Sequence, residues 1–194
     1  MRYRWAWLAW LLAALGVAAN AVGAPGASRS GAAALAAQTP AAQTPAQWRS
    51  FDLLLDLQDL PRAYTCRELW QRSDELLLAL GARHWPQILV YHCGATPAQS
   101  SRSPRVQLQF QLPLALTAAQ SRYADVTAVR RTIRLTPAQL PSFTGADCGL
   151  LKQLSSELLP ATPVRVVGAP LECSAAGAAR PGFALEVEAL IPRS

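Results

Sequence analysis

The feature that most constrains this chain is an internal similarity between its two halves. Residues 51–61 align without gaps with residues 131–141, and both segments end in Leu-Pro. The first cysteine of each copy, Cys66 or Cys148, opens a leucine-rich stretch, and the second cysteine follows 27 residues later at Cys93 or 25 residues later at Cys173. Such self-similarity predicts one supersecondary unit used twice. The alternative is a chance match between two leucine-rich stretches in a biased composition.

Each copy has the pattern strand, helix, strand, strand. Apolar and polar residues alternate in the strand segments, so each strand has one apolar face. The predicted strands are residues 51–58, 88–93, 105–114, 126–135, 164–173 and 183–191, and the predicted helices are residues 66–80 and 148–159. The sequence therefore predicts an α+β fold: two tandem strand-helix-strand-strand repeats that form a mainly antiparallel six-stranded sheet with both helices on one face.

The ends of both helices carry local signals. Thr65 and Glu68 have the spacing of a capping box, in which each side chain satisfies a backbone amide at the helix start. Gly81 suits the left-handed position that closes a helix. Asp147 precedes the second helix, so we expect its carboxylate to cap that helix.

The four cysteines are expected to form one disulfide within each repeat. A strand that packs against the helix before it runs back toward the start of that helix, which brings Cys66 to Cys93 and Cys148 to Cys173. A metal site that uses Cys93 with His92 and His84 is the alternative, but the second copy has no histidine and the sequence has no close cysteine pair. A catalytic cysteine would need a free thiol beside a base, whereas each of these four cysteines has a predicted disulfide partner.

The N-terminus predicts export. Arg2 and Arg4 precede an uncharged apolar run over residues 5–19, and small residues follow it, so a signal peptide over residues 1–21 with cleavage after Ala21 is expected. An uncleaved anchor is the alternative, although the run is shorter than the roughly 20 residues that span a bilayer. No later segment is apolar enough to cross a membrane. The protein is expected in the periplasm or outside the cell, where disulfides persist.

Residues 22–47 are rich in alanine, proline, glutamine and threonine. Such a segment buries too little apolar surface to offset its ordering entropy, so it is predicted to be a disordered linker. Repeat 1 then covers residues 48–114 and repeat 2 covers residues 115–194. Together they are long enough for an ordinary core.

The sequence carries 18 basic and 12 acidic residues, and its basic residues offer one binding lead. Arg122, Arg130, Arg131 and Arg134 cluster around one predicted strand, and Arg122, Arg130 and Arg134 are the candidates for an anion-binding patch. The alternative is a solvated strand face. Aromatic and basic residues do not interleave on the exposed strand faces, so nucleic acid is not an expected partner.

Catalytic signals are sparse. No carboxylate pair, nucleophile elbow or phosphate-binding glycine loop can be placed, and no cofactor is expected. The overall pattern is similar to that of many small exported proteins of Gram-negative bacteria. We therefore expect a non-catalytic binding or assembly module of the cell envelope, whose partner is an envelope protein or an anionic polymer. The alternative is a hydrolase or other enzyme acting on envelope polymers, with a site shaped by residues 94–104.

Overall fold

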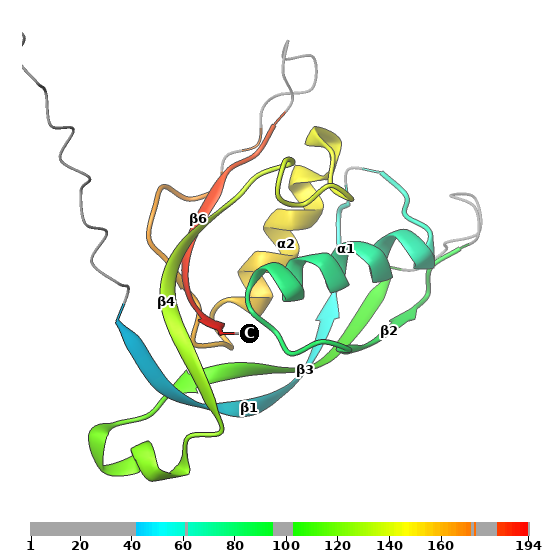
Figure 1. Cartoon of the computed structure of the whole chain (residues 1–194). Helices are drawn as coiled ribbons and strands as arrows, with labels where there is room; N and C mark the ends of the chain where they lie inside the picture. The colour runs from blue at the N-terminus through cyan, green and yellow to red at the C-terminus, as the bar shows by residue number, and fades with distance from the viewer. Residues whose placement is uncertain (1–41, 61, 95–102, 172, 174–181, 194) are drawn as a thin grey trace, which may run out of the picture. The chain divides into compact units, whose positions relative to one another are not determined.

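The computed structural model describes residues 42–60, 62–94, 103–171, 173 and 182–193. These residues form one six-stranded antiparallel sheet of order β2-β3-β1-β4-β6-β5. The strands are β1 (Gln43–Asp56), β2 (Gln87–Tyr91), β3 (Arg105–Ala115), β4 (Val126–Leu135), β5 (Arg165–Val166) and β6 (Leu185–Pro192). Helices α1 (Cys66–Ala79) and α2 (Cys148–Leu158) lie on the same side of the sheet (Figure 1). The predicted α+β class is confirmed.

Strand β1 joins the two sides of the sheet. Its residues 46–56 pair with β3, whereas only residues 43–46 pair with β4. The strand therefore begins inside the predicted disordered linker, and the predicted boundary at residue 47 is wrong by five residues. Ala46 is fully buried against Ala128 and Leu190. The composition of this segment hid the strand because backbone pairing needs no large apolar side chain. The predicted signal peptide and the rest of the predicted linker, up to residue 41, lie outside the described residues.

The strand order reads the same outward from the central pair, as β1-β3-β2 on one side and β4-β6-β5 on the other. A duplicated unit would give this order, and the duplication itself stays a prediction. Strand β5 is much shorter than the predicted strand over residues 164–173. Beyond β5, pairing continues only with the hydrogen bond from the Val167 amide to the Glu186 carbonyl. Pro170 then lacks an amide donor for a longer ladder.

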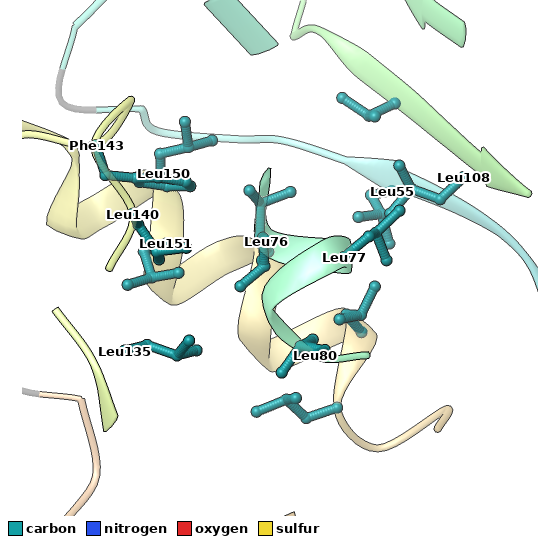
Figure 2. Close-up of a cluster of buried hydrophobic side chains, with 14 of the residues drawn as sticks. Leu55, Leu76, Leu77, Leu80, Leu108, Leu135, Leu140, Phe143, Leu150 and Leu151 are labelled. Atoms are coloured by element: carbon teal, nitrogen blue, oxygen red, sulfur yellow. The ribbon is translucent and has the colours of Figure 1, made fainter. Parts of the chain in front are cut away.

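The core fills the space between the sheet and both helices. The predicted apolar faces are confirmed: Val106, Leu108, Phe110 and Leu112 of β3 are buried, and the alternate residues are more exposed. Figure 2 shows where the strand and helix side chains meet. The residues labelled there come from β1, β3, β4, both helices, the residue that follows α1 and the segment before α2: Leu55, Leu76, Leu77, Leu80, Leu108, Leu135, Leu140, Phe143, Leu150 and Leu151.

The ends of α1 follow their predicted signals. The Thr65 hydroxyl accepts from the Glu68 amide, and the Glu68 carboxylate accepts from the Thr65 amide at 2.8 Å, so the capping box is present. Gly81 has a φ of +87° after the helix, and a Cβ atom there would lie 2.8 Å from the Leu190 carbonyl oxygen. A side chain at this position would therefore be strained and would also meet strand β6.

Two disulfides hold the helix starts. Cys66 is bonded to Cys93, and Cys148 is bonded to Cys173, which are the pairs within each half that the sequence predicts. Each bond ties the first turn of a helix to the chain that follows it by 27 or 25 residues. Closing loops of this length stabilises a fold by about 3 to 4 kcal/mol each on the chain-entropy account.

Candidate ligand-binding groove

The side of β1, β3 and β2 that faces away from the helices carries mainly polar side chains, and we call it the outer face. It is formed by Ser50, Asp52, Leu54 and Asp56 of β1, Arg105, Gln107, Gln109 and Gln111 of β3, and Gln87, Leu89 and Tyr91 of β2. The register places Gln109 between Asp52 and Gln87, and Gln107 between Leu54 and Leu89. Both helices lie on the other side of these strands (Figure 1).

An open groove of about 520 Å³ crosses the outer face. Ser50 and Asp52 contribute to it from β1, and Gln109 and Gln111 contribute from β3. Residues 83–87, which lead from the end of α1 into β2, form the rest of its polar lining. Its volume falls in the range of roughly 300–1,000 Å³ that is common for small-ligand sites. The groove draws on the first half of the chain alone.

The polar side chains of the groove are held by one another. Gln107 and Gln109 each donate from Nε2 to the Asp52 carboxylate, at 3.1 and 3.0 Å. Gln111 donates to the Ser50 hydroxyl at 3.2 Å and accepts from the Arg83 guanidinium at 3.2 Å. These mutual bonds orient the amide groups before any ligand arrives.

Trp85 stands beside the groove with 94% of its surface exposed. The Arg83 amide donates to the Gln111 carbonyl, and regular pairing resumes at Gln87 opposite Gln109. More residues lie between Arg83 and Gln87 than between their partners on β3, so residues 84–86 loop outward. Trp85 has a φ of +71°, which is an uncommon conformation for a bulky side chain, and residues held in such conformations cluster at functional sites.

A second polar cluster lies inside the molecule, around Asp147. The side chain of Asp147 has no exposed surface and accepts bonds from the Tyr64 hydroxyl at 2.9 Å, from Arg62 at 3.1 Å and from Arg72 at 3.1 Å. Glu68 binds the same two arginines on the other side. The Arg62 guanidinium also lies 4.0 Å from the centre of the Tyr64 ring. We call these five residues the buried ion cluster.

The buried ion cluster corrects one prediction and adds a feature that sequence analysis missed. The Asp147 carboxylate does not cap α2, because it accepts from the amide and hydroxyl of Thr144 at 2.8 and 2.9 Å. Thr144 and Asp147 have the same spacing as Thr65 and Glu68. The sequence therefore contained a signal for the hydrogen bonds between Thr144 and Asp147. No local pattern could show that the pair would meet Arg62 and Arg72.

The surroundings of Asp147 control its charge. Burial by itself would raise the pKa of Asp147, but the Thr144 amide and hydroxyl, the Tyr64 hydroxyl and the charge of Arg72 lower it below the ordinary value. Burial and the bond to Asp147 raise the pKa of Tyr64. Asp147 therefore stays ionised and Tyr64 stays neutral near pH 7. Because Asp147 is inaccessible and its oxygens are already bound, the cluster links the two halves and is poorly suited to chemistry on a ligand.

The predicted anion-binding residues fall in different places. Arg130 and Arg134 lie on β4, where Arg130 is paired with Glu188 at 2.7 Å and Arg134 with Glu186 at 3.7 Å. Arg122 lies on the short 3-10 helix η2 (Ala118–Tyr123), over the ring of Tyr123. Arg131 of β4 is exposed. The patch stays a prediction, and two of its three members already have acidic partners.

The structure places Cys93, but it describes little of the loop that was expected to shape an enzyme site. The Cys93 sulfur is in a disulfide, and no group of three or more histidine, cysteine or acidic residues could hold a metal within the described part of the chain. The loop expected to shape an enzyme site lies mostly outside the described residues, because residues 95–102 are not among them. In the ranges that the structure describes, no helix combines the length and apolar character needed to cross a bilayer.

No family model, curated protein or solved structure matches this chain.

Proposed function

We propose that the protein is an exported, non-catalytic binding module of the bacterial cell envelope that holds its ligand in the groove on the outer face. The observation that carries this proposal is the exposed Trp85 beside a groove of pre-oriented amide groups. A large exposed aromatic ring is costly to leave in water, and rings of this kind are enriched where proteins bind ligands. The predicted signal peptide and linker would deliver this module beyond the inner membrane and give it reach.

The chemistry of the groove favours binding over catalysis. Asp52 is the one carboxylate that lines it, and that carboxylate accepts from both Gln107 and Gln109. Hydrolysis of a polymer commonly needs a second acid or base, or an activated nucleophile. His84 also lines the groove, and histidine is the side chain that most often acts as a general acid or base in enzymes. The enzyme hypothesis therefore depends on His84 acting with Asp52.

The corresponding side of β4 and β6 also favours a binding site on the outer face. On β4 and β6 the arginines are paired with glutamates across the strands, so this face satisfies its own charges. The outer face of β1, β3 and β2 instead exposes Leu54, Leu89 and Trp85. Exposed large apolar groups with a polar surround are typical of interaction sites.

The test is retention of the full-length protein on a bacterial envelope fraction. We expect Trp85→Ala to lose most of the retention, because the ring is part of the site. Trp70→Ala is the matched control, since Trp70 is a 44% exposed tryptophan on α1, outside the groove. Equal retention of both variants and the unmodified protein would place the binding site elsewhere. Release of soluble fragments that is abolished by His84→Ala would support the enzyme hypothesis instead.

A further inference from the structure

We infer that the groove accepts an uncharged, hydroxyl-rich oligosaccharide. The inference rests on the proposed binding function and adds the chemical class of the ligand. In this arrangement the apolar face of a sugar ring packs on the indole of Trp85, and its hydroxyl groups bond to the amides of Gln87, Gln109 and Gln111. Each of these side chains lines the same groove.

The charge of the groove selects a neutral ligand. Its fixed charges are one carboxylate, Asp52, and one guanidinium, Arg83, so they balance. A polyanion such as a nucleic acid requires several unpaired cations along its path. Arg83 also lies 5.9 Å from the ring of Trp48 and bonds to Gln111, so it is committed to the wall of the groove.

The hydrogen-bonding groups select a ligand that both donates and accepts. A glutamine amide has two N–H donors and a carbonyl acceptor. Gln109 uses one donor on Asp52, and its amide still has a second N–H and its carbonyl oxygen to offer. A sugar hydroxyl donates one bond and accepts others, so it can match either end of the amide. Because Asp52 holds Gln107 and Gln109 in place, binding need not order those two side chains.

Other classes of ligand fit less well. A lipid tail would need a continuous apolar surface, whereas Gln107 separates Leu54 from Leu89 in the register. A peptide that extends the sheet would pair with the free edge of β2, not with the face of β3, because strand addition uses main-chain bonds. Trp85 lines the groove together with Gln109 and Gln111 of β3, which suits a ring-shaped ligand that contacts both the indole and the amides.

The first experiment titrates the full-length protein with two neutral hexasaccharides, one of β-1,4-linked glucose and one of β-1,4-linked N-acetylglucosamine. Binding is measured by tryptophan fluorescence and by calorimetry. We expect saturable binding of at least one of them and about tenfold or greater loss of affinity in Trp85→Gly. Glycine accepts the positive φ of this position, so the variant removes the ring without straining the backbone. Trp70→Ala should bind as the unmodified protein does. Absence of saturable binding, or unchanged affinity in Trp85→Gly, would overturn the inference.

The second experiment separates the ligand class from the site. The envelope fraction is treated either with periodate and a mixture of glycosidases, because periodate cleaves vicinal diols but leaves 1,4-linked N-acetylglucosamine uncut, or with a protease. Loss of Trp85-dependent retention after the carbohydrate treatment alone supports the oligosaccharide. Loss after protease alone overturns it and leaves the proposed groove intact, with a protein as the partner. Retention that is independent of Trp85 removes the proposed function as well.

Discussion

Asp147 illustrates how much of this protein is decided by single side chains. It lies just before α2, yet its carboxylate is buried against Arg62, Tyr64 and Arg72, which belong to the first half of the chain. A buried charge is tolerated only when it is paired and hydrogen-bonded. The buried ion cluster therefore couples the packing of the two halves through one residue.

We expect Asp147→Asn to destabilise the protein by about 3 kcal/mol, because it removes the fully buried carboxylate that pairs with Arg62 and Arg72 and leaves Glu68 as the one carboxylate beside both arginines. Urea unfolding followed by circular dichroism measures the change. Asp56→Asn is the matched control: Asp56 forms an exposed pair with Arg105, so its loss should cost no more than about 1 kcal/mol. Equal effects of the two substitutions would contradict the role given to the cluster.

The same cluster predicts a dependence of stability on pH. Burial would raise the pKa of Glu68, but bonds from the Thr65 amide, Arg62 and the Thr65 hydroxyl lower it, and the pKa of Asp147 is lowered as well. Groups with lowered pKa stabilise the fold fully above the unfolded carboxyl pKa of about 4 and lose that contribution as pH falls through the folded values. The free energy of unfolding should therefore decline below about pH 4.

The control for the pH dependence is Asp147→Asn, in which the decline should be shallower because one of the two carboxylates is gone. Urea unfolding at a series of pH values measures both slopes. A decline of the same size in Asp147→Asn and the unmodified protein would assign the acid sensitivity to other carboxylates.

At the scale of elements, the strands of the two halves use their outer faces differently. On β1 and β3 three glutamines surround the Asp52 carboxylate and one ion pair joins Asp56 to Arg105, whereas on β4 and β6 both arginines of the outer side pair with glutamates. The register places Arg134 directly opposite Glu186, whereas Arg130 lies opposite Leu190 and pairs diagonally with Glu188. A face with paired charges attracts an anionic surface weakly, since the glutamates cancel the field of the arginines.

The predicted anion-binding patch can therefore be tested through its partners. We expect the protein to be only weakly retained on heparin, and retention to increase when Glu186 and Glu188 are both changed to glutamine. Retention should fall when Arg130 and Arg134 are both changed to glutamine, and added salt should remove it in every variant. A glutamate variant that elutes with the unmodified protein would show that these pairs do not mask the patch.

At the scale of the whole described fold, the two halves of the sheet pair with each other over a short junction. Residues 43–46 of β1 pair with residues 126–129 of β4, and Ala46 packs with Ala128 and Leu190 in a small cluster apart from the main core. The two three-stranded parts of the sheet share these few pairs. Small side chains allow the backbones to approach there.

We expect Ala46→Asp to destabilise the protein by about 3 to 5 kcal/mol, because it places an unpaired charge in the buried junction. The neighbouring substitution Gln47→Asp should change stability by less than about 0.5 kcal/mol, since Gln47 is exposed. Urea unfolding of both variants tests the correction to the linker boundary. Similar stabilities would mean that this segment does not belong to the folded core.

Much of the fold was predictable because its signals are local. Alternation of apolar residues marked the faces of β1, β3 and β6, and the capping box of Thr65 and Glu68 marked the start of α1. The cysteine spacing in each half, combined with the reversal of chain direction after a helix, predicted the pairs Cys66–Cys93 and Cys148–Cys173. Each of these inferences needs only the periodicity and chemistry of one segment.

The remaining features depend on segments that are distant in the sequence. The bonds of Asp147 to Arg62 and Arg72 span 75 or more residues, and the groove joins β1, β3 and residues 83–87. Ala46 is a strand residue because it lies between Ala115 of β3 and Val126 of β4. Local patterns were enough to define most strands, both helices and the pairing of the cysteines. Which polar groups meet was set by the three-dimensional arrangement alone, because it depends on how the strands are ordered in the sheet and not on any pattern within one segment.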